Sequence, residues 1–157
     1  MNRITTIIFL HLSCLFNAHS QGELAYSPSF TAIIVTDIEK SAQWYTRIFR
    51  LKEINRFESE ERGFVIALLQ NDDFTLELLQ LQNSIQPQEF IPDYNAKTKV
   101  VGLFKIGFQV SEFDEWINHL KTNQVSLTGD IVTDPTLNKR MIIVTDPDEN
   151  RIQFFER

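Results

Sequence analysis

The chain has 157 residues, of which 43% are hydrophobic and 23% are charged, and its formal net charge is −6. These values predict a single soluble globular domain with a substantial core. Lys and Arg are scattered and form no basic stripe, which argues against nucleic acid or an anionic membrane surface as a partner.

The first twenty residues have the layout of a secretory signal peptide. Arg3 precedes a mostly apolar run over residues 4–16, and Ala18-His19-Ser20 supplies small residues for cleavage before Gln21. The run is too short to span the roughly 30 Å of a bilayer core, so an uncleaved anchor is the weaker interpretation. We therefore expect export, periplasmic or secreted, after cleavage near Ser20. The mature form would not be embedded in a membrane, and residues 21–28 would be a linker.

Lipoprotein processing at Cys14 is a rival to simple cleavage. It is the weaker one, because His11 stands where a lipobox has an aliphatic residue. Removal of residues 1–20 would leave a chain with no Cys and with His119 as its single His. No disulfide is then possible. We expect His119 to lie on the solvent side of a helix.

The rest of the chain repeats one order of elements: a strand, a helix and three strands. The first half predicts strands near 30–36, 51–58, 64–70 and 74–81, with a helix capped by Thr36 or Asp37. The second half predicts strands near 104–110, 130–133, 141–145 and 151–156, with a helix capped by Ser111. Between them, the polar segment 82–102 is either a linker or a lid. Neither half is large enough to fold alone, so the two must pack together.

Three segments resemble the vicinal oxygen chelate superfamily of glyoxalases, bleomycin-resistance proteins and extradiol dioxygenases. They are Phe30 to Tyr45, Phe74 to Leu79, and Thr145 to Glu156, which is similar to the closing Asp-Pro-Asp-Gly-Asn hairpin of the family. The resemblance implies an α+β fold in one domain over 29–157. Two βαβββ modules, at about 29–82 and 103–157, would form an incomplete eight-stranded barrel around a central cavity.

The family often forms homodimers, and we expect one here. The sequence does not decide whether the modules pair within one chain or exchange between two. Glu149 stands where the family usually has Gly in the closing turn. A left-handed residue is needed there, so we expect Asn150 to supply it or the turn type to differ.

The resemblance also indicates four metal-ligand positions, which here hold Phe30, Glu77, Lys105 and Gln153. Metal-binding members have His and Glu there, with Gln sometimes in place of a His. Phe30 has no lone pair to donate, and a charged Lys105 would repel a cation. One carboxylate and one amide are too few for a transition metal. We therefore predict no metal and no cofactor, at a degenerate divalent-metal site.

Strand alternation places the apolar residues of each strand on the helices and the others on one concave surface. The residues predicted to bind a ligand there are Phe30, Thr75, Glu77, Lys105, Gln109, Arg151, Gln153 and Phe155. Glu77 and Lys105 are the candidates for acid–base chemistry. Lys105 is expected to sit near Glu77 and Gln153. That pairing would be a remnant of a lost site, a means of ligand recognition, or part of a catalytic pair.

These residues favour an exported protein that binds a small organic molecule in a metal-free cavity. The alternative is a metal-dependent lyase or isomerase of the lactoylglutathione-lyase type, so whether the chain is an enzyme stays open. A third possibility is a dimerising module of a larger exported assembly. The sequence does not name the ligand.

Overall fold

The computed structural model describes residues 27–95 and 97–157. The predicted signal peptide, Cys14 and all but the last two residues of the predicted linker lie outside the described residues. No helix in the described part of the chain is long and apolar enough to cross a membrane.

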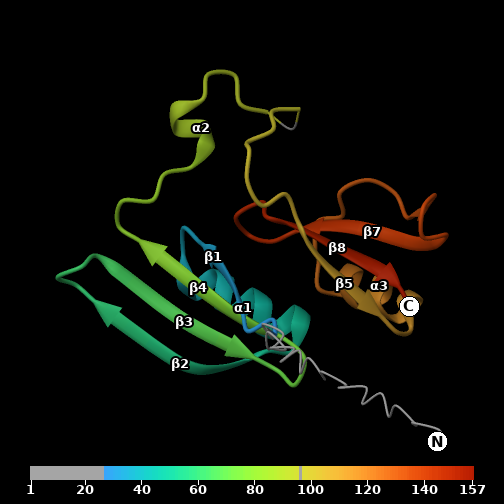
Figure 1. Cartoon of the computed structure of the whole chain (residues 1–157), viewed down its shortest axis with the longest axis horizontal. Helices are drawn as coiled ribbons and strands as arrows, with labels where there is room; N and C mark the ends of the chain where they lie inside the picture. The colour runs from blue at the N-terminus through green and yellow to red at the C-terminus, as the bar shows by residue number, and fades with distance from the viewer. Residues whose placement is uncertain (1–26, 96) are drawn as a thin grey trace, which may run out of the picture.

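The first module is a four-stranded sheet with one helix on it (Figure 1). The chain forms β1 (Thr31–Ile34), α1 (Ile38–Phe49), β2 (Lys52–Ser59), β3 (Phe64–Gln70) and β4 (Thr75–Leu81). The strand order is β1-β4-β3-β2, with β1 parallel to β4 and the other pairs antiparallel. Asp37 caps α1, since its side chain accepts a hydrogen bond from the Lys40 amide at 3.0 Å. Asp37, one of the two predicted caps, is therefore the one used.

The second module repeats this topology. Its elements are β5 (Ile106–Val110), α3 (Phe113–Thr122), β6 (Val132–Asp134), β7 (Lys139–Thr145) and β8 (Arg151–Glu156), in the strand order β5-β8-β7-β6. Ser111 does not cap α3 as predicted. Glu112 holds the cap position with a left-handed backbone, φ 52°, and makes no capping bond through its side chain.

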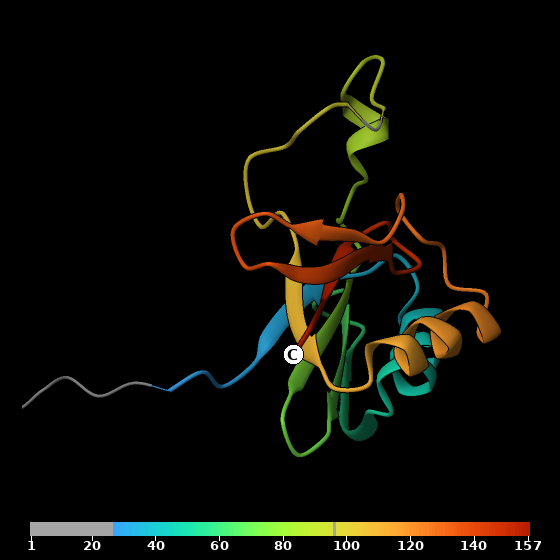
Figure 2. The same cartoon turned by 90° about the vertical axis from the view of Figure 1, so that its right-hand side faces the viewer.

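The two modules share one core between their helices. Phe49, at the end of α1, packs against three rings of the second module. The distances between ring centres are 5.1 Å to Phe108 of β5, 5.6 Å to Phe154 of β8 and 6.2 Å to Trp116 of α3. Both helices lie on the same side of the two sheets (Figure 2). The opposite side of each sheet carries no helix formed by residues 27–95 or 97–157, and we call it the inner face.

The predicted α+β fold with two βαβββ modules is confirmed, and the two sheets are not closed into a barrel. The segment between β4 and β5 contains one short helix, α2 (Pro87–Phe90), and arches away from the sheets (Figure 1). Several of its apolar side chains are exposed, among them Ile85, Phe90 and Leu103.

Candidate functional site

The inner face of the first sheet is mostly apolar. Leu76 and Leu78 of β4 are fully buried under α1, so the alternating residues Thr75 and Glu77 project to the inner face. Glu77 is half-buried and is paired across the sheet with Ala32 of β1 and Leu68 of β3. Glu77 is therefore a carboxylate in apolar surroundings.

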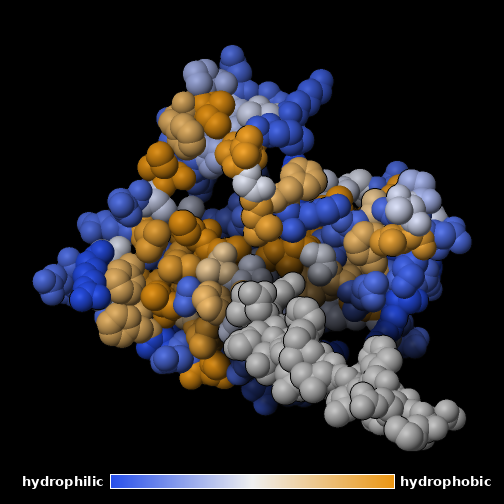
Figure 3. Space-filling model, in the orientation of Figure 1, coloured by the Kyte–Doolittle hydropathy of each residue, from blue (hydrophilic) through white to orange (hydrophobic). Residues whose placement is uncertain are grey.

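Several apolar side chains of this face are open to solvent. Ile34 is 54% exposed and Phe57 is 55% exposed, and the centre of the Phe57 ring lies 5.8 Å from that of the tilted Phe64 ring. Phe30, just before β1, is 58% exposed. Figure 3 shows hydrophobic surface over the first sheet on this side of the molecule.

The inner face of the second sheet is more polar. Ile152 and Phe154 of β8 are buried toward α3, so Arg151, Gln153 and Phe155 project the other way. Gln153 is paired with Gly107 of β5, and Phe155 is paired with Gln109. Lys105 directly precedes β5, beside the start of β8.

Gln153 lies in the centre of this face and is only 1% exposed. Its Nε2 donates to the sulfur of Met141 on the neighbouring strand. Its Oε1 is buried and accepts no hydrogen bond from any described residue. A buried amide oxygen without a donor costs about 1–3 kcal/mol. Buried polar atoms are paired in most proteins, so this unpaired oxygen requires an explanation.

Open space lies at the position paired with Gln153. A Cβ added at Gly107 would meet no described atom within 4 Å. The absence of a side chain at Gly107 therefore leaves open space on the inner face at the strand position paired with Gln153.

Lys105 does not pair with Glu77. Its Nζ lies 5.9 Å from the centre of the Phe104 ring, and the Arg151 guanidinium lies over the same ring at 4.8 Å. No ion pair among the described residues joins Lys105 or Arg151 to a carboxylate. The expected neutralisation of Glu77 by Lys105 is therefore wrong. The reason is that the exposed Lys105 lies along the Phe104 ring on the second sheet, whereas Glu77 belongs to the first.

The residues at the four metal-ligand positions do not fit a divalent metal. Only Glu77 and Gln153 offer oxygen atoms, and one carboxylate with one amide is too few ligands. Exchange of modules between two chains would combine the same four residue types. Over residues 27–95 and 97–157, no three His, Cys, Asp or Glu side chains are grouped so as to hold a metal ion.

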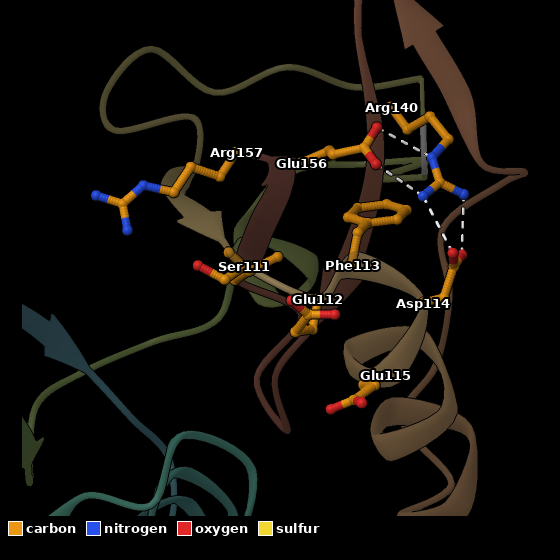
Figure 4. Close-up of a pocket in the computed structure, with 9 residues that line it drawn as sticks. Ser111, Glu112, Phe113, Asp114, Glu115, Arg140, Glu156 and Arg157 are labelled. Atoms are coloured by element: carbon orange, nitrogen blue, oxygen red, sulfur yellow. Dashed lines mark hydrogen bonds and ion pairs between the residues drawn. The ribbon is translucent and has the colours of Figure 1, made fainter.

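Two hollows lie away from the inner face, and neither is lined by any of the eight predicted site residues. The larger, of about 440 Å³, lies where α3 begins. There Arg140 binds Asp114 and Glu156 and lies over the Phe113 ring at 4.9 Å (Figure 4). Arg140 lowers the pKa of both carboxyls by hydrogen bonding to them. The smaller hollow, of about 310 Å³, lies between the helices.

His119 lines this smaller hollow and does not simply face solvent, as the sequence had suggested. It is half-buried, and its Nε2 lies 3.1 Å from the carbonyl oxygen of Ile48 on α1. The contact joins α3 to α1. Helical periodicity along α3 could not reveal it, because it depends on how the two modules pack.

The turn after β7 also joins the modules, which the sequence did not indicate. Asp146 is buried and accepts a hydrogen bond from the Tyr45 hydroxyl at 2.8 Å. Asp148 accepts hydrogen bonds from Ser41 at 3.2 Å and from the Thr36 amide and hydroxyl. A carboxylate at the start of α1 is favoured by the helix dipole. The turn residues therefore have a structural role.

Comparison with known proteins gives one family. The Glyoxalase/Bleomycin resistance protein/Dioxygenase superfamily matches over residues 27–154. The chain is 28% identical over 127 residues to the uncharacterized protein YwkD of Bacillus subtilis (strain 168), covering 80% of this chain and 93% of that protein.

Solved structures show the same fold. A glyoxalase family protein from Enterococcus faecalis superposes with a TM-score of 0.70 at 17% identity, covering 83% of this chain and 97% of that one. The trypanothione-dependent glyoxalase I of Leishmania major gives 0.59 at 19% identity, covering 81% and 84%. At such low identities the likeness concerns the fold alone. The chain belongs to the glyoxalase/bleomycin resistance protein/dioxygenase superfamily.

Proposed function

We propose that this protein is exported and binds a small organic molecule on its inner face without a metal. The observation that carries the proposal is the buried, unpaired Oε1 of Gln153. A protein site built to receive a hydrogen-bond donor leaves such an atom unpaired until the ligand arrives.

The surroundings of Gln153 support the binding of a ligand at its side-chain oxygen. Gly107, at the paired strand position, leaves open space. Phe104, which directly precedes β5 and is 52% exposed, supplies contact area for an organic ligand on the second sheet. Polar groups come from the second sheet, with Arg151 and Gln109 in the strands beside the amide.

The apolar inner face of the first sheet suits a second copy of the chain. Ile34 and Phe57 project from the same open sheet face and are more than half exposed. A contiguous exposed apolar face of this kind marks an interaction surface. We propose that a homodimer covers it and leaves the second sheet to hold the ligand.

A metal-dependent lyase is the less supported function. It requires three or four metal ligands in one place. The four corresponding positions contain one carboxylate, one amide, one ammonium and one phenyl ring.

The test of the proposal is a steric block at Gly107. In Gly107→Val, a β-branched side chain fills the open space, and the strand should tolerate it because no described atom lies within reach. A library of small aromatic amides, acids and amines is screened by NMR, and the side-chain amide signals of Gln153 are followed. We expect ligands that shift these signals in the unsubstituted protein and that Gly107→Val no longer binds, with unchanged or higher stability.

The control is Gly129→Val, at a glycine outside the strands with no described atom within 4 Å of an added Cβ. Its backbone is left-handed, so some loss of stability is expected but no loss of binding. If Gly107→Val binds every ligand as the unsubstituted protein does, the inner face around Gln153 is not the binding site.

A further inference from the structure

Two cations stand together at one end of the inner face. Strands β5 and β8 are parallel and begin side by side, with Ile106 paired to Ile152. Lys105 and Arg151 are the residues just before these two. By strand alternation, both lie on the side of Gly107 and Gln153, away from α3.

Both cations contact one aromatic ring. The Arg151 guanidinium is 4.8 Å and the Lys105 ammonium 5.9 Å from the centre of the Phe104 ring. Phe104 itself is 52% exposed. Attraction to the ring face holds each cation in place, while the two positive charges repel each other.

Two arginines of the described chain are neutralised by ion pairs. Arg56 binds Glu39 and Glu53, and Arg140 binds Asp114 and Glu156. In a chain with a net charge of −6, carboxylates are plentiful. No described carboxylate forms an ion pair with Lys105 or Arg151, so their positive field is available to a ligand.

The unpaired oxygen belongs to the next residue after Arg151 on the same face of β8. Arg151 and Gln153 are two residues apart on one face of β8, which separates their Cα atoms by about 7 Å. This spacing suits one small molecule that carries an anionic group at one end and an N–H or O–H donor near it. The buried, unpaired oxygen is independent of the charges and itself points to a ligand.

We propose that the ligand of the inner face is an organic anion. Its carboxylate or phosphate group binds between Lys105 and Arg151, its apolar body lies against Phe104, and a donor group reaches the Oε1 of Gln153. This inference rests on the proposed function, and it adds the charge class of the ligand.

Four probes with one aromatic body and one hydroxyl donor test the proposal: 6-hydroxy-2-naphthoate, 6-hydroxy-2-naphthyl phosphate, 6-hydroxy-2-naphthamide and 6-hydroxy-2-naphthylmethylamine. Dissociation constants are measured by NMR titration of residues 21–157. We expect the anions to bind on the order of tenfold more tightly than the neutral amide, and the amine to bind most weakly. The tighter of the two anions identifies the group, carboxylate or phosphate, that the site takes.

Matched variants separate the site from the net charge. Lys105→Met/Arg151→Met removes both cations of the site, and Lys121→Met/Arg62→Met removes the same two residue types from exposed positions elsewhere. The first variant should lose the preference for anions and still bind the neutral amide, and the second should keep the preference. Thermal unfolding of both checks that each is folded.

The outcomes distinguish the two proposals. If the amide binds as tightly as the anions, or if Lys105→Met/Arg151→Met keeps the anion preference, the charge class is wrong while the ligand-binding function stands. If none of the four probes shifts the Gln153 signals, both the charge class and the proposed function are contradicted.

Discussion

At the scale of single residues, the turn between β7 and β8 shows how this chain departs from its family. The sequence predicted that Asn150 would take the left-handed conformation or that the turn type would differ. The structure instead gives the left-handed φ of 65° to Glu149 itself, at the position where the family usually has Gly. A non-glycine residue there costs about 1–2 kcal/mol.

Glu149→Gly should therefore stabilise the fold. The gain from relieving the left-handed backbone is partly offset, because Gly adds entropy to the unfolded chain, so we expect roughly 0.5–1 kcal/mol in the free energy of unfolding. Urea unfolding measures it. Glu149→Ala is the matched control, since alanine removes the carboxylate and keeps the backbone cost. An equal gain in both variants would show that charge, and not backbone conformation, limits stability at this turn.

At the scale of elements, the same turn connects the second module to α1. Asp146 accepts hydrogen bonds from the Asn150 amide at 2.8 Å and from the Tyr45 hydroxyl at 2.8 Å. Burial raises the pKa of Asp146 above its ordinary value of 3.8, although hydrogen bonds from Asn150 and Tyr45 oppose the change. Burial, with the nearby Asp146 charge, also raises the pKa of Tyr45.

The raised pKa of Asp146 makes the stability of the fold depend on pH. A carboxyl that holds its proton more tightly in the folded state favours folding below its unfolded pKa, and that contribution is lost as pH rises through the folded pKa. The Asp146→Asn variant has no titratable group at this position, so it lacks this dependence on pH. Its free energy of unfolding, relative to the unsubstituted protein, should therefore rise as pH increases upward from about 4. A difference that does not change with pH would show that Asp146 ionises in the fold as readily as in the unfolded chain.

At the scale of the whole molecule, the apolar inner face of the first sheet is exposed to solvent. The apolar inner face of the first sheet has no helix or strand of its own chain on it, within the part of the chain that the structure describes. We expect sedimentation equilibrium to give twice the mass of one chain. Phe57→Lys, on this face, should shift the equilibrium to monomer, whereas Leu137→Lys, at a comparably exposed position in the turn before β7, should not. A monomer at all concentrations would contradict the dimer.

Much of the fold could be predicted from the sequence because its signals are local. Alternation in β4 and β8, the apolar spacing of α1 and the duplicated order of elements all depend on neighbours in the chain. They correctly predicted that Glu77 and Gln153 project away from the helices. The start of α3 was predicted less well, because Ser111 is a good capping residue in general and the backbone there turns left-handed at Glu112 instead.

The arrangement of the site could be predicted only in part. No local pattern shows that Lys105 lies along Phe104 and away from Glu77, or that His119 reaches the carbonyl of Ile48. These contacts depend on the relative positions of side chains far apart in sequence or free to choose among rotamers. The unpaired oxygen of Gln153 likewise becomes visible only when all its neighbours are placed.

The central proposal is that this member of the superfamily binds its ligand without a metal. The most direct test is the metal content of residues 21–157 after incubation with zinc, nickel, manganese or iron(II), beside the variant Phe30→His/Lys105→His/Gln153→Glu, which restores ligands at the four positions. We expect no bound metal in the unsubstituted protein and about one ion per site in the restored variant. One ion per site in the unsubstituted protein would contradict the account.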